Sequence, residues 1–344
     1  MGLRRATFEI ATRCVGIFAP RAGEPVAEPR SIFVLRNNDI GDLLVVTPLF
    51  EALKRRFPRA KIVAGIGSWN LDVLKHNPYV DEVVLNAPWH NGKVRPQGLI
   101  AGLRYIYTSS EARDLAAQRC EIGIDVLGSG YGALLMMRCG MPFRLGVRGY
   151  GGGHSTAQRC VVYNEREHVG RAALRFAELL GATELPENRP QLFAWPKPEI
   201  NGVIVMAPGG GHPGNCWPLE NYVELARALT PRKIVVIGGE KDREAAAKIA
   251  EGRVNVDVVA GALPLAETFR LIAGCAMVIT NSSMAMHAAA AFRKPCFALL
   301  GAGVRSASAH AAQWAYPETR VLGAERGVRG VWSPAEVFET ISAS

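Results

Sequence analysis

A short polar segment early in the chain combines a glycine with a carboxylate. Residues 37–42 read Asn-Asn-Asp-Ile-Gly-Asp and lead from an apolar run directly into an apolar helical stretch. Gly41 permits a tight turn and the close approach of a ligand to the backbone. The carboxylate of Asp42 can accept a proton from a hydroxyl group, or it can serve only as the N-cap of the helix. The spacing is compatible with both roles.

A glycine-rich loop in the second half has the composition of a phosphate-binding loop. Residues 207–214 read Ala-Pro-Gly-Gly-Gly-His-Pro-Gly, after one apolar run and before a helical one. Consecutive glycines expose backbone N–H groups that can surround an anion, and the next helix adds partial positive charge at its N-terminus. The loop matches neither the GxGxxG dinucleotide fingerprint nor a P-loop. It is a candidate phosphate cradle, with a plain flexible connector as the alternative.

Two further segments place polar residues where apolar runs end. Residues 280–287 read Thr-Asn-Ser-Ser-Met-Ala-Met-His, and residues 238–242 read Gly-Gly-Glu-Lys-Asp. Ser282 or Ser283 can cap a helix, and their hydroxyls can also hold a diphosphate. His287, one turn into that helix, is either a ligand contact or a structural histidine. A carboxylate in the second segment can receive a ribose hydroxyl or only begin a helix. Together with the glycine-rich loop, these strand ends indicate a nucleotide pocket.

The elements that must position these residues alternate between strands and helices, which is typical of parallel sheets covered by helices. In the first half we expect strands at 31–36, 61–67, 82–86, 121–127 and 143–147, and helices at 43–57, 98–119 and 165–180. In the second half we expect strands at 203–207, 233–238, 254–260, 277–280, 296–300 and 320–322, and helices at 219–229, 241–250, 265–273, 285–292 and from 334. Ligands of such sheets bind at the carboxyl ends of the strands, and the cleft between two such halves is the expected site.

A proline-rich stretch separates the two halves. Pro186, Pro190, Pro196 and Pro198 occur there with few periodic apolar positions, as in an interdomain linker. We therefore expect an N-terminal domain at 1–182, a linker at 183–200, a second domain at 201–330 and a terminal helix at 331–344.

Composition narrows the class of protein. The 344 residues are 49% hydrophobic and carry a formal charge of +9, which suits a phosphate-rich partner such as a nucleotide or an anionic lipid surface. The seven cysteines form no CxxC pair, which favours a reducing cytoplasm over a disulfide framework or a zinc site. No zinc pattern, RNP-like motif or clustered basic helix indicates nucleic-acid binding.

The N-terminal segment allows two interpretations. No apolar run in the sequence is long enough to span a bilayer. Leu3, Ile10, Cys14 and Ile17 recur at helical spacing with arginines between them. This segment is either a basic amphipathic helix on a membrane surface or a helix packed on the first domain.

The sequence resembles glycosyltransferase family 9, the heptosyltransferases, in both halves and in the family's order. Residues 36–42, with Thr-Pro at 47–48 and residues 52–58, look like the N-terminal signature of the family. Pro-Gly-Gly at 208–210 with Trp217 and Tyr222 looks like its donor-domain loop. The pattern continues through residues 238–242, Gly261, Thr280, Asn281, Met286, His287, Pro295 and Gly301.

The resemblance implies a GT-B fold, with two Rossmann-like doubly wound α/β domains facing across a cleft. It also implies an inverting, metal-independent transfer from an ADP-sugar to a lipopolysaccharide-core or other lipid-linked saccharide, without a cofactor. Asp42 would be the general base, and backbone N–H groups and helix N-termini would stabilise the leaving ADP. Such an enzyme would work in the cytoplasm or peripherally on the inner membrane.

The resemblance and the strand-end pattern assign two sets of binding residues. The donor set is Pro208, Gly209, Gly210, Asn215, Trp217, Gly239, Glu240, Asn281, Ser282, Ser283, Met286 and His287. The acceptor set, chosen by position and charge, is Arg36, Gly41, Arg144 and Arg148.

Three departures from the family pattern leave alternatives open. Ser-Ser-Met at 282–284 stands where Asp-Thr-Gly is common, Asn215 stands for a lysine, and Ala285 stands for a proline. Another nucleotide-sugar donor, or binding of a sugar nucleotide without turnover, are therefore alternative functions. A Rossmann oxidoreductase is disfavoured because residues 37–42 lack the GxGxxG pattern.

Overall fold

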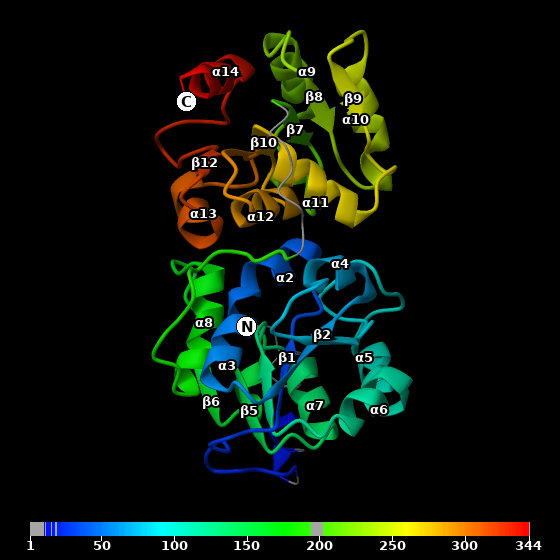
Figure 1. The fold of residues 1–344 in the computed structure, drawn as a ribbon, viewed down its shortest axis with the longest axis vertical. Coiled ribbons are helices and arrows are strands. Elements are labelled where there is room, and N and C mark those ends of the chain that lie inside the picture. Colours follow the sequence, from blue (N-terminus) through cyan, green and yellow to red (C-terminus); the bar gives the residue numbers. More distant parts are fainter. Residues whose placement is uncertain (1–9, 11, 15, 18, 194–201, 344) are drawn as a thin grey trace. The chain divides into compact units, whose positions relative to one another are not determined.

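The computed structural model describes residues 10, 12–14, 16, 17, 19–193 and 202–343. The chain divides into two compact units, Met1–Asn188 and Arg189–Ser344, which Figure 1 shows in sequence colours. Residues 194–200 of the predicted linker lie outside the described residues, as does most of the N-terminal segment for which a basic amphipathic helix was considered.

The first unit is built on a six-stranded sheet in the order β3-β2-β1-β4-β5-β6, in which every neighbouring pair is parallel. The strands are β1 (Ser31–Leu35), β2 (Lys61–Ile66), β3 (Asp81–Val84), β4 (Ile122–Asp125), β5 (Phe143–Arg148) and β6 (Arg159–Val162). The α-helices are α2 (Ile40–Val46), α3 (Pro48–Arg56), α4 (Leu71–Leu74), α5 (Leu99–Thr108), α6 (Ser110–Ala117), α7 (Gly130–Arg138) and α8 (Val169–Leu179), with 3₁₀ turns η1 (Ser68–Asn70) and η2 (Gly153–Ser155).

The second unit repeats this architecture with a six-stranded parallel sheet in the order β12-β11-β10-β7-β8-β9. Its strands are β7 (Ile204–Ala207), β8 (Ile234–Val236), β9 (Val256–Val258), β10 (Met277–Thr280), β11 (Cys296–Leu299) and β12 (Thr319–Leu322). Its α-helices are α9 (Leu219–Ala228), α10 (Arg243–Ala250), α11 (Leu265–Gly274), α12 (Met284–Ala291), α13 (Ala307–Trp314) and α14 (Pro334–Ser342), with 3₁₀ turns η3 (Pro213–Asn215) and η4 (Glu240–Asp242).

The strand order places the polar loops of each unit on one edge of its sheet. In both sheets the first strand is central: later strands are added on one side of it and then on the other. Thus β1 lies between β2 and β4, and β7 lies between β8 and β10. Ligands of doubly wound sheets bind at the carboxyl edge near such a switch point. The loops that the sequence singled out follow β1, β7, β8 and β10, so within each unit they lie at this edge.

Two predicted helices are each divided in the structure, and several observed elements were not predicted. The helix predicted at 98–119 is α5 and α6, because Ser109 has an extended backbone and caps α6. The single helix predicted at 43–57 is two helices, because Pro48 occupies the first turn of α3 and a proline cannot continue the hydrogen-bond ladder of the preceding helix. Helix α7 was not predicted, since it begins Gly-Tyr-Gly and relies on Ser129, whose side chain accepts from the N–H of Gly132. Strand β6 and helix α13 lie in segments with little apolar periodicity.

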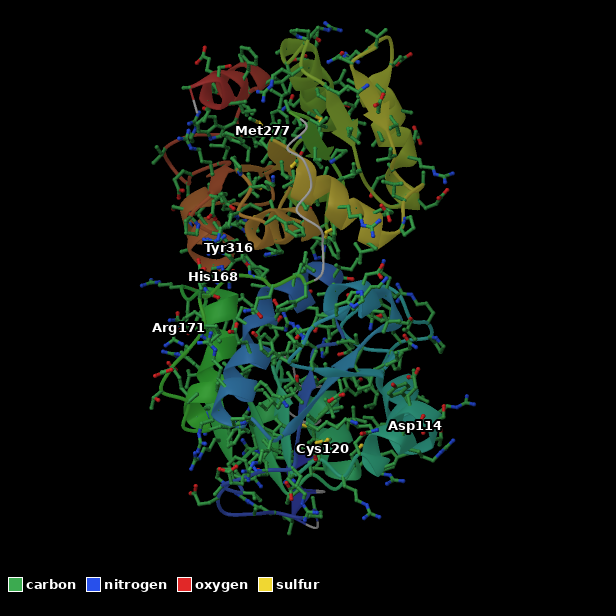
Figure 2. The ribbon with its side chains drawn as sticks, in the orientation of Figure 1. Asp114, Cys120, His168, Arg171, Met277 and Tyr316 are labelled. Atoms are coloured by element: carbon green, nitrogen blue, oxygen red, sulfur yellow. The ribbon has the colours of Figure 1, made fainter. Side chains whose placement is uncertain are left out.

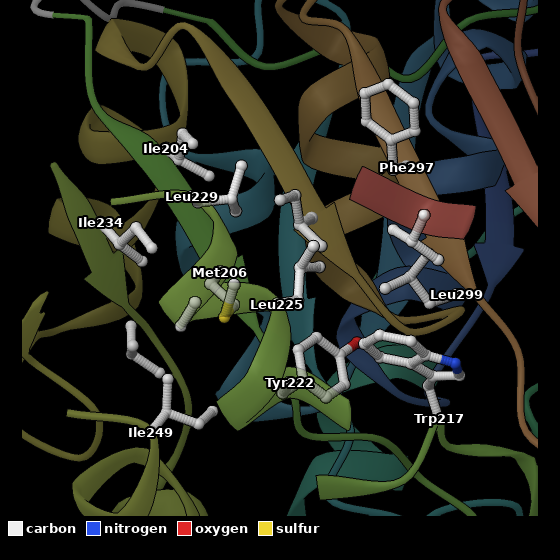
Figure 3. Close-up of a cluster of buried hydrophobic side chains, with 14 of the residues drawn as sticks. Ile204, Met206, Trp217, Tyr222, Leu225, Leu229, Ile234, Ile249, Phe297 and Leu299 are labelled. Carbon is white, nitrogen blue, oxygen red and sulfur yellow. The ribbon is translucent and has the colours of Figure 1, made fainter. Parts of the chain in front are cut away.

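The core of the second unit surrounds the sheet beneath the glycine-rich loop. Figure 3 shows Trp217 and Tyr222 beside Leu225 and Met206. The rings of Trp217 and Tyr222 meet edge to face, with centroids 5.0 Å apart. These side chains are almost completely buried, so the residues that follow the glycine-rich loop are anchored by apolar packing.

The seven cysteine thiols are free. Figure 2 labels Cys120 in the first unit, where burial raises the pKa of its thiol to about 11. Burial also raises the pKa of Cys275 to about 11. A raised thiol pKa lowers the thiolate fraction and with it the reactivity of the sulfur, so these thiols act as small apolar side chains.

Replacing Leu225 by Ala tests the packing beneath the loop. Leu225 is fully buried among aromatic and aliphatic side chains, and truncation leaves a cavity that the fixed sheet cannot fill. We expect a loss of about 2–5 kcal/mol in the free energy of unfolding, measured by urea denaturation. The half-buried Leu219 of the same helix is the matched control and should lose less. Equal losses for both variants would contradict this packing.

Candidate functional site

Asp42 is oriented by a buried arginine. It lies in the first turn of α2, while Asp39 occupies the N-cap position, so the interpretation of Asp42 as the N-cap is wrong. The Nη2 of Arg36 lies 2.8 Å from the Oδ1 of Asp42, and the Nε of Arg36 donates to the Asp42 carbonyl at 3.1 Å. The Arg36 side chain is 4% exposed and that of Asp42 is 30% exposed. Arg36 thus holds the carboxylate from its buried side, and the carboxylate remains accessible to solvent.

This geometry corrects the role predicted for Arg36. Its guanidinium is committed to Asp42 and almost fully buried, so it positions the carboxylate and does not grip an acceptor. Gly41 lies inside α2 next to Asp42, and its φ is not positive. The predicted tight turn at Gly41 is therefore wrong, although the partly exposed backbone there adjoins the carboxylate.

The loops after β2 and β3 support the segment that leads from β1 into α2. The carbonyl of Asn38 accepts from the indole N–H of Trp69 at 2.9 Å and from the amide of Asn70 at 3.0 Å. The amide of Asn38 donates to the carbonyl of His90 at 2.9 Å. Burial, helped by the charge of Arg36, lowers the pKa of His90. Trp69 and His90 lie far from Asp42 in sequence, and no local motif identified them.

Asp125 is a second carboxylate at this edge that the sequence analysis missed. It ends β4 beside Leu35 of β1 and is 1% exposed. Burial raises its pKa, while hydrogen bonds from Ser129 and Gly128 and the charge of Arg36 oppose that shift. These bonds fix the start of α7. The sequence signal for Asp125 was a carboxylate at the end of an apolar strand. In the structure this carboxylate binds the loop that leads into α7.

The structure separates the two other arginines of the predicted acceptor set. Arg144 is 1% exposed and donates to the carbonyls of Thr156, Pro20 and Met141. Burial, with a contribution from Arg21, lowers its pKa to about 10. The predicted contact of Arg144 with an acceptor is therefore wrong. Arg148, at the carboxyl end of β5, is exposed and stays a candidate.

In the second unit, Asn281 connects the glycine-rich loop to the helix that follows it. Its Oδ1 accepts from the backbone N–H of Trp217 at 2.8 Å and from the Tyr222 hydroxyl at 3.1 Å. Its Nδ2 donates to the carbonyls of Pro208 and Gly209. Asn281 is 1% exposed, so its own role is to hold the loop and not to touch a ligand.

Close backbone packing holds the other loops of this edge. The ammonium of Lys241 donates to the carbonyl of Gly210 at 3.0 Å, and the carboxylate of Asp242 accepts from the N–H of Gly239 at 2.8 Å. A Cβ on Gly209 would lie 2.7 Å from that carboxylate. The carbonyls of this loop therefore bind side chains of the protein. Lys241 was not among the site residues predicted from the sequence.

Three residues of the predicted donor set are buried, and two of them have hydrogen-bond partners within the unit. Trp217 is 2% exposed, Met286 0% and His287 4%. The indole N–H of Trp217 donates to the carbonyl of Trp332 at 2.8 Å, and the Nδ1 of His287 lies 3.1 Å from the Tyr316 hydroxyl. The three side chains are packed inside the unit in the free protein, and their ligand contacts stay predictions.

The remaining donor residues border the loop surface. Ser283 is the N-cap of α12, and the hydroxyl of Ser282 lies 2.8 Å from the Nε2 of His310. Asn215, Gly239 and Glu240 are exposed, and Gly209 and Gly210 are half-buried, whereas Pro208 is buried. This edge thus offers glycine backbone, serine hydroxyls and the start of a helix, which are suitable groups for a phosphate ester.

Comparison with known proteins identifies the chemistry that this scaffold carries. The sequence profile of glycosyltransferase family 9 (heptosyltransferase) matches residues 109–307, which is more than half of the chain. The chain belongs to glycosyltransferase family 9. It is a glycosyltransferase, and its predicted α/β fold of the GT-B type is confirmed.

Individual relatives agree with this membership. The glycosyltransferase is 25% identical over 307 residues to lipopolysaccharide heptosyltransferase 2 of Escherichia coli (strain K12), covering 78% of this chain and 82% of that protein. A family 9 glycosyltransferase structure from Veillonella parvula has a TM-score of 0.74 at 18% identity, over 94% of this chain and 99% of that one. The E. coli heptosyltransferase WaaC, solved with ADP, has a TM-score of 0.70 at 17% identity, over 91% and 99%.

No group of three or more His, Cys, Asp or Glu side chains within the described ranges is arranged to hold a metal ion. None of the helices that the structure describes has the length and apolar character needed to cross a membrane.

Replacing Asn281 by Ala tests its role as the anchor of the loop. The change leaves the N–H of Trp217 and the carbonyl of Pro208 without their partner, and an orphaned buried polar group costs about 1–3 kcal/mol. We expect a loss of this size in the free energy of unfolding, measured by urea denaturation. Asn215→Ala is the control, because Asn215 is exposed and its backbone carbonyl accepts from Gly301. Unchanged stability of Asn281→Ala would refute the anchoring role.

Proposed function

We propose that this glycosyltransferase transfers a heptose from ADP-heptose to a saccharide of the lipopolysaccharide-core type, with inversion and without a metal ion. The observation that carries the proposal is the accessible Asp42 carboxylate held by the buried Arg36 guanidinium. A general base needs a fixed carboxylate that a substrate hydroxyl can reach. Asp42 meets both requirements at the carboxyl edge of its sheet.

In this mechanism Asp42 acts directly on the acceptor. Its Oδ atoms accept the proton of the acceptor hydroxyl while the hydroxyl oxygen attacks the anomeric carbon of the donor sugar. The bond between that carbon and the diphosphate oxygen breaks, and the electron pair leaves with ADP. A single displacement of this kind inverts the configuration at the anomeric carbon. Arg36 contributes by orienting the carboxylate and takes no proton itself.

The second unit supplies the donor site in this proposal. Gly209, Gly210 and the start of α12 at Ser283 provide N–H groups and a hydroxyl near one another at one sheet edge. Fixed dipoles of this kind stabilise the charge that develops on a leaving diphosphate. The presence of ADP in the solved WaaC heptosyltransferase and the relatedness to lipopolysaccharide heptosyltransferase 2 support ADP-heptose as the donor and the lipopolysaccharide core as the acceptor.

Two residues favour a second candidate donor. Asn215 and Ser282 stand where the family commonly has a lysine and an aspartate, and Ser282 is bound to His310. A neutral serine and histidine in place of a carboxylate change the hydroxyl pattern that the site can recognise. A different nucleotide sugar is therefore the alternative substrate within the same reaction class, and binding without turnover is the alternative to catalysis.

Calorimetric titration of the full chain with ADP, UDP, GDP and NAD, each with and without Mg²⁺, tests the donor. We expect selective binding of ADP with an affinity that does not depend on Mg²⁺, because backbone N–H groups and Lys241 are charge-complementary to a diphosphate. Tighter binding of UDP or GDP would replace ADP-heptose with the alternative donor. Binding that requires Mg²⁺ would contradict metal independence.

Replacing Asp42 by Asn tests the base. The amide keeps the size of the side chain but cannot accept the proton, so we expect kcat to fall about 10²–10⁴-fold while ADP affinity stays within about twofold. Transfer is measured as ADP release in the presence of acceptor. The control is Asp114→Asn, an exposed carboxylate of α6 labelled in Figure 2. Wild-type turnover of Asp42→Asn would remove it from the role.

Arg36→Gln serves as a second variant for the same pair. Because Arg36 acts through Asp42, we expect kcat to fall with little change in the acceptor KM. The double variant should be no slower than Asp42→Asn alone, since residues in one interacting pair are not additive. Multiplicative losses would show that Arg36 acts independently of Asp42.

A further inference from the structure

One helix of the first unit exposes apolar side chains that its own fold does not cover. Ile100 of α5 is 84% exposed, Leu99 is 50% and Tyr107 is 48% exposed. Ile100 and Tyr107 are seven residues apart, so they lie on one side of the helix, two turns from each other. Apolar side chains of this size gathered on one surface of a soluble protein mark an interaction site.

The opposite side of α5 is firmly packed. Ile106 is 1% exposed and belongs to the core cluster that contains Phe33 of β1 and Leu115 of α6. Tyr105 meets Trp89 edge to face at 5.4 Å, and its hydroxyl donates to Glu111. The helix therefore presents its outer side as a rigid surface, since its inner side is held by the core.

The charges on and before this helix are mostly positive. Residues 93–114 contain Lys93, Arg95, Arg104 and Arg113, and their two acidic residues, Glu111 and Asp114, both lie in the next helix, α6. Both carboxylate oxygens of Glu111 accept hydrogen bonds from Asn86 and Tyr105. Lys93, Arg95 and Arg104 are exposed, and among the described residues they have no ion-pair partner. The surface is thus complementary to an anionic partner.

The loop between β3 and α5 contacts the segment that precedes Asp42. In that loop, the carbonyl of His90 accepts from the amide of Asn38. Trp89 stacks on Tyr131 of α7 at 5.3 Å. These contacts tie the loop before α5 to the segment that leads into Asp42.

Other exposed apolar residues lack this combination. Val254 and Val328 of the second unit are 100% and 80% exposed but are single side chains. Tyr150 and Tyr163 form a pair with ring centroids 5.0 Å apart, and the exposed Val162 precedes Tyr163. The neighbouring segment carries Glu165 beside Arg166, and Glu167 is paired with Arg175, so its charges are mixed.

We propose that Lys93, Arg95, Ile100, Arg104 and Tyr107 form a docking surface for an anionic phospholipid membrane. Interfacial helices insert large apolar side chains among the acyl chains, place aromatic rings at the headgroup level and keep cations near the phosphates. A free phosphate or an anionic saccharide would engage the cations but not Ile100. Membrane binding itself is independent of the reaction. Its role, to bring Asp42 near a lipid-linked acceptor, rests on the proposed function.

Flotation of the full chain with vesicles of phosphatidylcholine, with and without 30% phosphatidylglycerol (about a third, enough to give a strongly anionic surface), measures the docking directly. We expect binding only to the anionic vesicles. Ile100→Glu should weaken it about tenfold by removing a buried apolar chain and adding a repelled charge. Arg104→Glu should weaken it about fivefold or more. Val254→Glu, a control at the fully exposed residue of the second unit, should bind like the parent chain.

Two results of the flotation would overturn the proposal. Binding of Ile100→Glu equal to that of Val254→Glu would show that the apolar side of α5 does not enter the bilayer and would leave only a phosphate contact through the cations. Equal binding of the parent chain to neutral and anionic vesicles would remove the role of charge. Circular dichroism of each variant confirms that its fold is intact.

A transfer assay in two formats separates docking from catalysis. With an O-deacylated, water-soluble acceptor, Ile100→Glu should turn over within about twofold of the parent chain. With the acceptor embedded in anionic vesicles, its apparent KM should rise about tenfold, following the loss of vesicle binding. An equal loss in both formats would place Ile100 in the reaction and contradict the docking role. If the parent chain transferred no sugar in either format, the proposed function would fail while the flotation result would stand.

Discussion

A guanidinium that has been removed from water needs acceptors for its N–H groups, and for Arg36 these are the carboxylate and the carbonyl of Asp42. Its side chain is 4% exposed and lies 2.8 Å from the carboxylate of Asp42. Removing one partner of a buried pair is far more costly than forming a pair on the surface. The same contact that satisfies Arg36 directs the carboxylate of Asp42 toward solvent. The stability of this edge and the geometry of the proposed base therefore depend on one interaction.

In the second unit, a neutral side chain holds the loop at the carboxyl edge of the sheet. Asn281 ends the central strand β10 and connects the glycine-rich loop to Trp217 and Tyr222. Glycine-rich segments lose much conformational freedom when they become ordered. Because Asn281 and Lys241 already hold the loop in the free protein, less of that freedom remains to be lost when a phosphate binds.

Sequence patterns predicted the parts of this protein that depend on local rules. The apolar strands are clear examples, and β10 was predicted with its observed bounds at Met277–Thr280. Whether a side chain is buried or exposed was harder to predict, because burial depends on contacts between residues that are distant in sequence. Arg144 resembles an exposed cation in sequence, yet it donates to Pro20, 124 residues away. Trp217, marked by a family motif, proved to be a core residue, and His90 carried no motif at all.

Two loops of the second unit pack so closely that only glycine fits at their contact. A Cβ on Gly301 would lie 2.0 Å from the carbonyl oxygen of Cys216. A Cβ on Gly303 would lie 2.6 Å from the carbonyl oxygen of Gly214. The N–H groups of Gly301 and Gly303 donate to the carbonyls of Asn215 and Gly214. These amides can contact solvent only when both loops separate. The loops should consequently exchange their amide hydrogens as one cooperative unit, although Cys216 and Gly301 are 85 positions apart in the sequence.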